Sequence, residues 1–507
     1  MKKFLIFAGI ALLVLVAGLS VLGIFLAPQL EEELEAVLSE RTGRPVQIDS
    51  FGWSVWPGLG FRGEGLTVGR ADEAFELFVR VESIHVQPGL FGLLRSPRSL
   101  NSITLKNLFV RIPPKRSSVA FNLKPIALTE NDSPPLREES PFLVERLVLE
   151  TAAIELESKD PSKPPRIIQI RTMTMRDIAF GRPSPFQADV HYPHPEGDVL
   201  VDGVFGPFDR NDPIRTPVSG HYTFRDADLS AFKEISGILT SEGDFNGNLG
   251  ENHIEGKATI PEFQLTKAEN VVPLSVDFVV DRLGSDVYLR DIRSSFLETE
   301  IHTVGEIVRS RAQEGRVLKL DVKGEKSRVE DLLRIALKGD QPPLTGQIQF
   351  TAAVTVPPGP GKVIERMEID GQFQIHEGQF TDPEFQKKLA QISKLGRADR
   401  GSDSDDRTFS DLTGDFRMEN SEIHFSRLQF GVPGMKVSLT GSYGLQSNQM
   451  DFRGRVSLEK AVSEMTSGGL SNLLKILDPL LRGEDGGTSV PIRIRGDRSS
   501  PSVSIDF

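Results

Sequence analysis

The chain has 507 residues, a formal net charge of −12 and an isoelectric point near 5.4. This balance excludes nucleic-acid binding as a class, because such proteins need a basic face to meet phosphates. Cysteine is absent, which excludes disulfides, cysteine-based zinc sites and thiol catalysis. The length allows two to four ordinary domains or one extended, repetitive body.

An uncharged apolar run opens the chain, from Phe4 to Leu26, directly after two lysines. Its 23 residues would reach about 34 Å as a helix, enough to cross a hydrocarbon core of about 30 Å. Four glutamates follow between residues 31 and 35. Because basic residues flank the cytoplasmic side of membrane helices, the pattern predicts a transmembrane anchor over residues 1–27 with a cytoplasmic N-terminus.

A cleaved signal peptide, cut near Gly18, is the alternative interpretation of this run. The apolar stretch continues eight residues past Gly18, and no small-x-small cleavage motif lies near its end. The uncleaved anchor is therefore favoured, and the rest of the chain is expected on the far side of the membrane.

After a short predicted helix at residues 28–43, alternation of apolar and polar residues dominates the chain. A period of two is typical of strands that bury one face. In the segments 75–83 and 102–112, the apolar side includes Phe75, Leu77, Val79, Val81, Ile103 and Leu105. The alternation then changes parity at Asn107, which predicts a bulge or a strand break there.

A hydrophobic-x-Gly-x-hydrophobic motif recurs through the rest of the chain. Its copies are centred on Gly203, Gly220, Gly256, Gly346, Gly371, Gly414, Gly441 and Gly454. The spacing is irregular, so a strict solenoid is not indicated. We interpret the motif as one strand type used many times, with glycine where neighbouring backbone approaches or the strand bends. In the predicted hairpin 439–458, Tyr443 and Phe452 are candidate wall residues.

Few helices are predicted in the remainder. Residues 327–339 begin with the capping-box pattern of Ser327 and Glu330, and residues 382–396 follow the N-cap candidate Asp382. An apolar stripe in residues 470–481 either plugs one end of the β-body or docks on a membrane or partner, and the plug is favoured. Residues 113–141, rich in Pro, Ser and charge, are predicted to be a linker or long loop.

Catalytic constellations are missing from the sequence. The pair His191 and His194 lies in a Pro-rich turn without a third ligand at helical spacing, so a surface turn is favoured over a metal site. No nucleophile-elbow, zinc-protease or phosphate-loop motif is present. We therefore expect a protein that is not an enzyme and uses no cofactor.

The predicted fold class is mostly β: an N-terminal transmembrane helix, then an elongated, repetitive antiparallel β-sheet body with a few short helices. The chain has 31 Phe residues but only 4 Tyr and 2 Trp. Because Phe has no polar tip, this balance suits dry packing between sheets or contact with acyl chains. The apolar faces form either a curved groove or an ordinary sandwich core. The anchor and the scarcity of covering helices favour the groove. Its candidate lining residues are Phe75, Leu77, Val79, Val81, Ile103, Leu105, Tyr443 and Phe452.

The order of several segments resembles the AsmA family. Near the N-terminus these are "LSERTGRPVQI", "WPGLGFRGEGLTVG" and "ITLKNLFVRI", and near the C-terminus "GQFQIHEGQFTDPEFQKKLAQIS" and "LTGDFRMENSEIHFSRLQFGVPGMKVSLTGSYGL". The resemblance covers about residues 1–112 and 365–507 well and the middle more loosely. It suggests an anchor (1–27), an N-terminal AsmA-like β region with a leading helix (28–140), a middle β-repeat region (141–364) and an AsmA-like C-terminal region (365–507).

The resemblance implies a single-pass protein of the bacterial inner membrane with most of the chain in the periplasm. It implies a non-enzymatic role in phospholipid transport that supports outer-membrane assembly or homeostasis. The implied partners are the inner-membrane bilayer, phospholipid acyl chains and outer-membrane assembly proteins, with no nucleic acid. The alternative is an envelope scaffold that influences outer-membrane protein insertion through protein contacts.

Overall fold

The computed structural model describes residues 35, 39, 44–54, 60–69, 78–88, 98–112, 142–157, 164–179, 181–209, 212–266, 268, 270–339, 341–381, 383, 386, 408–432, 435–458, 488–497 and 502–505. The predicted anchor, the stripe at 470–481 and the residues Phe75 and Leu77 lie outside these ranges, as does nearly all of the predicted helix 382–396. None of the helices in the described ranges has the length and hydropathy needed to cross a bilayer.

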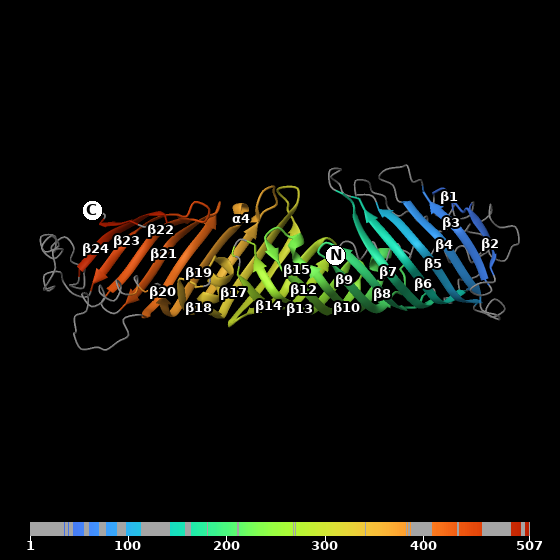
Figure 1. The fold of residues 1–507 in the computed structure, drawn as a ribbon, viewed down its shortest axis with the longest axis horizontal. Helices are drawn as coiled ribbons and strands as arrows, with labels where there is room; N and C mark the ends of the chain where they lie inside the picture. Colours follow the sequence, from blue (N-terminus) through green and yellow to red (C-terminus); the bar gives the residue numbers. More distant parts are fainter. Residues whose placement is uncertain are drawn as a thin grey trace. The chain divides into compact units, whose positions relative to one another are not determined.

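The prediction of a mostly β chain is confirmed. The chain divides into two compact units, each drawn in Figure 1 as a succession of strands. Unit 1 comprises residues 1–232, 238–258 and 281–284, and unit 2 comprises residues 233–237, 259–280 and 285–507.

The strands of unit 1 are β1 (Val46–Gln47), β2 (Ser50–Ser54), β3 (Gly60–Val68), β4 (Phe78–Pro88), β5 (Arg98–Ile112), β6 (Phe142–Leu156), β7 (Arg166–Ala179), β8 (Ser184–Pro193), β9 (Glu196–Phe205), β10 (Pro217–Asp228) and β12 (Ile238–Asn248). Two short 3-10 helices, η2 (Pro213–Arg215) and η3 (Leu229–Ala231), flank β10. The strands β13 (Glu251–Leu265) and β14 (Val271–Leu283) contribute residues to both units.

Unit 2 contains β11 (Ile235–Ser236), β15 (Asp286–Phe296), β16 (Thr299–Arg309), β17 (Arg316–Arg328), β18 (Leu344–Val356), β19 (Glu368–Phe380), β20 (Thr408–Glu419), β21 (Glu422–Val432), β22 (Met435–Gly444), β23 (Gln449–Leu458), β24 (Thr488–Asp497) and β25 (Ser502–Ile505). Its helices are α3 (Val329–Ala336) and α4 (Val363–Arg366).

The predicted antiparallel pairing holds for the recorded ladders except one. β5 and β6 are parallel, from Arg98 beside Phe142 to Ile112 beside Leu156. Two parallel neighbours need a crossover connection of a dozen or more residues. The segment 113–141 that joins them is long enough to provide it, although the sequence pattern did not reveal this consequence.

The parity change at Asn107 is confirmed, but the predicted bulge or strand break is not found there, because β5 keeps the same pairing register with β4 and with β6 on both sides of Asn107. Asn107 has a φ of 49°, and Thr151 on the parallel neighbour β6 has a φ of 61°. The burial pattern shifts by one residue on both strands at this point, so that Leu105 and Leu108 are both buried. β5 continues through Asn107, so the inward face is preserved after the change of parity.

Unit 1 has a closed apolar core. In the part of unit 1 that the structure describes, the cluster contains 28 buried residues, many from β4 to β7, and Val110 and Val144 are fully inaccessible to solvent. The apolar cluster is continuous from strand to strand because its residues pair with one another. Val81 on β4, for example, lies between Leu66 on β3 and Leu108 on β5. Side chains with this degree of burial pack against one another like a protein interior.

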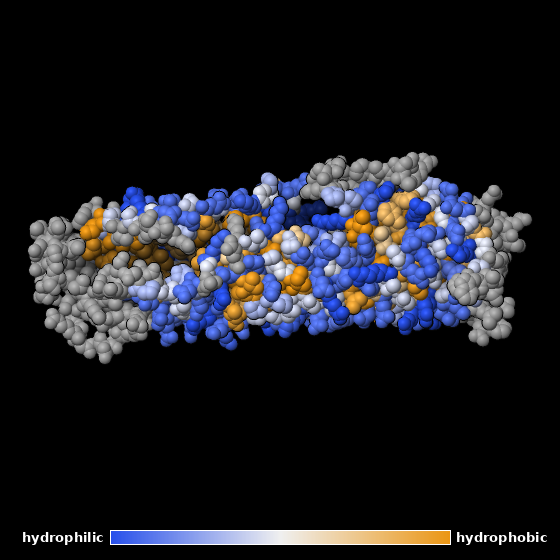
Figure 2. All heavy atoms as spheres, in the orientation of Figure 1, coloured by the Kyte–Doolittle hydropathy of each residue, from blue (hydrophilic) through white to orange (hydrophobic). Residues whose placement is uncertain are grey.

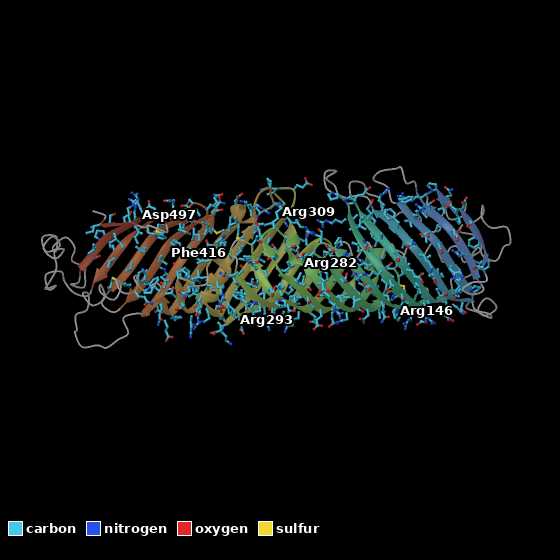
Figure 3. All side chains as sticks on the ribbon, in the orientation of Figure 1. Arg146, Arg282, Arg293, Arg309, Phe416 and Asp497 are labelled. Carbon is cyan, nitrogen blue, oxygen red and sulfur yellow. The ribbon has the colours of Figure 1, made fainter. Side chains whose placement is uncertain are left out.

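A buried cation lies at one turn of unit 1. The Arg282 side chain, 2% exposed and labelled in Figure 3, donates hydrogen bonds to the carbonyls of Leu249 (2.8 Å) and Gly284 (2.9 Å) and to Asn252 Oδ1 (2.7 Å). All three acceptors are neutral, and burial lowers the pKa of Arg282. The guanidinium has a structural role here, because its five N–H donors can bond several carbonyl oxygens at once.

His85 on β4 gives unit 1 a predicted pH dependence. Its side chain is buried, and its Nε2 has no hydrogen-bond partner among the described residues. Burial lowers the pKa of His85, and the positive charges of Arg62 and Lys106 lower it further. The unfolded chain therefore binds a proton more readily than the folded one, and stability falls as the pH drops below about 6.5.

We expect His85→Leu to flatten this pH dependence. The measurement is the denaturant midpoint of unit 1, followed between about pH 7 and pH 5, the range in which an ordinary histidine titrates. An unchanged slope in the variant would show that His85 is not the group responsible.

Candidate functional site

The most distinctive surface of unit 2 is the inner face of its ladder, defined as the side that carries the apolar cluster around Ile375 and Val437. The strands β15 to β25 pair in chain order, each antiparallel to the next. In Figure 1 the strands β18 to β24 run side by side from gold to red. Because side chains alternate along each strand, the register fixes which residues share this face.

The inner face consists of rows of apolar residues and glycine across β18 to β24. One row runs through Phe350, Phe373, Gly414, Leu428, Leu439, Gly454 and Ile492. The next row runs through Ala352, Gly371, Phe416, Phe425, Gly441, Phe452 and Ile494. Neither row contains a charged or hydrogen-bonding side chain, so the face offers contacts to hydrocarbon and little else.

Aromatic rings connect the strands along this face. The ring centroids of Phe373 and Phe416 are 6.2 Å apart, those of Phe416 and Phe425 are 6.2 Å apart, and those of Phe425 and Phe452 are 5.8 Å apart. All three pairs are tilted, a favourable arrangement for aromatic rings. The result is a continuous aromatic strip over β19 to β23, with Phe416 labelled in Figure 3.

The repeated glycine motif explains how these rings fit. On the neighbouring strands β19 and β20, Gly371 lies opposite Phe416 and Gly414 lies opposite Phe373. A Cβ at Gly371 would lie 2.8 Å from the Phe416 ring, and one at Gly414 would lie 2.5 Å from the Phe373 ring. Each glycine therefore makes room for the ring of its partner strand, a known means of stabilising glycine in sheets.

The inner face of unit 2 is less enclosed than the core of unit 1. Among the described residues, its cluster has 7 buried residues and 12 partly buried ones, against 28 and 12 in unit 1. Phe350, Phe373, Phe416, Phe425 and Phe452 are all only half-buried. Figure 2 shows an orange, hydrophobic hollow in the region of β19 to β24, so the described surface includes an accessible apolar concavity.

Helix α3 covers part of this face. Its residues Leu332 and Leu333 pack against the cluster, and Val329 is buried in it. The predicted capping box is wrong: the N-cap residue is Arg328 and no side chain caps the helix. Ser327 Oγ instead donates to the Glu300 carbonyl, because the strand β17 extends through Arg328.

The outer face of the same ladder is charged. Cross-strand ion pairs join Arg417 to Asp370 (2.9 Å), Arg427 to Asp415 (2.8 Å) and Arg493 to Asp451 (2.9 Å). The first two pairs are largely exposed, and such pairs contribute little to stability, about 0–1 kcal/mol each. Their main consequence is that the outer side of the sheet is charged and hydrated, in contrast to the apolar inner side.

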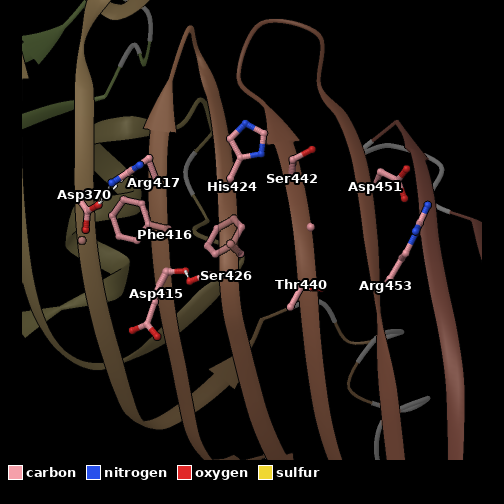
Figure 4. Close-up of a pocket in the computed structure, with 13 residues that line it drawn as sticks. Asp370, Asp415, Phe416, Arg417, His424, Ser426, Thr440, Ser442, Asp451 and Arg453 are labelled. Atoms are coloured by element: carbon pink, nitrogen blue, oxygen red, sulfur yellow. Dashed lines mark hydrogen bonds and ion pairs between the residues drawn. The ribbon is translucent and has the colours of Figure 1, made fainter.

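A shallow pocket of about 700 Å³ lies on the polar side of β19 to β23. Figure 4 shows its lining, which includes His424, Ser426, Thr440, Ser442 and Arg453. The three carboxylates of this lining, those of Asp370, Asp415 and Asp451, are all paired with arginine. Among the described residues, no group of three His, Asp or Glu side chains could hold a metal ion. We place the candidate site on the inner face, where the continuous apolar surface lies.

The structure separates the predicted lining residues into two environments. Val79, Val81, Ile103 and Leu105 lie in the closed core of unit 1, at 6%, 1%, 5% and 2% exposure. Tyr443 and Phe452 lie half-buried on the inner face of unit 2, where Tyr443 pairs with Ile423 and Met450. The Tyr443 hydroxyl donates to Asn448 Oδ1 at 3.1 Å. The contribution of these residues to lipid binding stays a prediction.

Sequence reasoning missed the centre of the aromatic strip. Phe373 and Phe416 each end one copy of the glycine motif, so the signal was present. What the motif alone does not give is the register that sets each glycine opposite the other strand's ring.

The fold and the site define a class of protein: a β-ladder chain with an uncharged, partly accessible inner face and a charged outer face. By sequence the chain is similar to Protein AsmA of Escherichia coli (strain K12), with 28% identity over 141 residues. The match covers 27% of this chain and 23% of that protein, so it spans less than a quarter of the relative's length. No family model and no solved structure matches. The weak homology agrees in part with the family resemblance seen in the sequence.

Proposed function

We propose that this chain is a non-enzymatic lipid-binding protein of the bacterial envelope, anchored in the inner membrane with its β-body in the periplasm. In this role it carries phospholipid in support of outer-membrane assembly or homeostasis. The observation that carries the proposal is the inner face of unit 2, where two adjacent rows over seven strands hold no charged side chain. The similarity to AsmA supports the envelope assignment.

The physical argument concerns what such a face can bind. Each CH₂ group removed from water contributes about 0.8 kcal/mol, so acyl chains gain affinity along the whole aromatic strip. Rings that are half-buried without ligand, such as Phe416 and Phe425, still have apolar area to cover. A headgroup finds no polar partner in these two rows and would remain outside the apolar hollow.

The test is to purify the full chain in mild detergent and to identify bound lipid by mass spectrometry. We expect phospholipid to co-purify, with little selection among headgroups and retention through repeated washing. A photo-crosslinking amino acid at Phe416 should label acyl chains, whereas one at the outward Arg417 should not. Absence of co-purified phospholipid, or equal labelling at the two positions, would contradict the proposal.

A further inference from the structure

The outer face of unit 2 changes sign along the ladder. On β19 and β20 the charged outward residues are mainly acidic: Glu368, Asp370, Asp411, Asp415 and Glu419, with Arg417 as the cation among them. On β22 to β24 they are mainly basic, and we call Lys436, Arg453, Arg455, Arg493 and Arg495 the basic patch. A cationic patch is unexpected in a chain with a net charge of −12.

Carboxylates neutralise only part of the basic patch. Asp451 accepts hydrogen bonds from Arg493 Nε (3.1 Å) and Nη2 (2.9 Å) and is 3.3 Å from Arg495 Nε. The side chains of Lys436, Arg453 and Arg455 are exposed, and none forms an ion pair with a described carboxylate. Figure 4 shows Arg453 among the residues that line the pocket.

The side chains between these cations are small and polar. The outward neighbours on the same strands include Ser438, Thr440, Ser442, Ser457 and Ser489, together with Pro491 and the carboxylate Asp451. The core of a specific protein interface is typically rich in aromatic residues and poor in charge, and the patch is the opposite. Diffuse attraction to a surface of many negative charges fits this composition better.

We propose that the basic patch docks unit 2 onto the surface of an anionic phospholipid bilayer. This inference rests on the proposed function, because the same three strands carry Leu439, Phe452 and Ile494 on their apolar side. Docking brings a bilayer to the strands that hold the acyl-chain surface. The attraction is electrostatic, so it weakens as salt shortens the Debye length.

The experiment uses the full chain in phosphatidylcholine nanodiscs, mixed with vesicles of phosphatidylcholine alone or with an equal share of phosphatidylglycerol. We expect capture of the anionic vesicles only, with loss at high salt. Each Lys or Arg near an anionic surface is worth about fivefold in affinity. The triple variant K436Q/R453Q/R455Q should therefore weaken capture by on the order of 100-fold.

The matched control is K319Q/K323Q/K326Q, which removes the same charge from the outer side of β17 and should leave capture unchanged. Equal capture of neutral vesicles, or equal loss in both triple variants, would overturn the proposal. So would salt-sensitive self-association without vesicle capture, which would assign the patch to the acidic β19–β20 face of a second copy. Capture that the patch variant abolishes supports docking even if no phospholipid co-purifies, in which case only the proposed function fails.

Discussion

Val81→Asp is expected to unfold unit 1. Val81 is 1% exposed and lies between Leu66 and Leu108 on the neighbouring strands. An aspartate there would be a buried charge without a partner, and the loss of packing adds to this cost. We expect a destabilisation of at least about 4 kcal/mol. Hydrogen exchange followed by mass spectrometry should show lost protection in peptides from β4 to β7.

The matched control is Val204→Asp, the same chemical change on β9. Val204 is 39% exposed and faces outward, so its carboxylate stays hydrated and the effect should remain within about 1 kcal/mol. Retained protection in Val81→Asp, together with loss of bound lipid, would mean that this face of unit 1 is a ligand groove rather than a packed core.

The period-two alternation was sufficient to predict strands and their inward residues. Val79, Val81, Ile103 and Leu105 were placed on one apolar side by alternation alone, and all four are buried together. The change of parity at Asn107 was also visible, but its interpretation as a bulge or strand break was wrong: the positive φ of Asn107 accompanies the change without an inserted residue. Local pattern therefore determined which face of each strand is apolar.

What the pattern could not decide was whether an apolar face is covered. Val81 and Phe452 have similar sequence surroundings, yet one is enclosed and the other is half-buried. Burial depends on which strands and helices lie across the face, and this is set by long-range packing. The parallel pairing of β5 with β6 was missed for the same reason, since it depends on a crossover outside the local pattern.

The capping-box failure at α3 shows competition between local and tertiary hydrogen bonds. Ser327 and Glu330 have the correct spacing, but Ser327 bonds to the Glu300 carbonyl and Glu330 accepts from the Gly346 backbone N–H. Both partners come from neighbouring strands. A helix that begins at the end of a strand can thus have its capping groups recruited by the sheet.

Phe452→Asp is expected to remove lipid binding while leaving the ladder of unit 2 folded. Phe452 is half-buried, and its ring contacts Phe425 at a centroid distance of 5.8 Å. A carboxylate in the aromatic strip would have to lose water whenever an acyl chain covered it, at a cost of several kcal/mol. We expect the phospholipid bound per chain to fall by on the order of tenfold or more, with circular dichroism unchanged.

Gln349→Asp is the control for this substitution, because it places the same charge on the outer side of the same ladder, away from the basic patch. Gln349 is exposed and lies opposite Gln374 on β19, so the new carboxylate is hydrated and bound phospholipid should be unchanged. Should Phe452→Asp unfold β22 to β24, Phe452→Ala separates stability from binding, since it removes the ring without adding charge. Full lipid binding by a folded Phe452→Asp chain would show that acyl chains do not lie on this face.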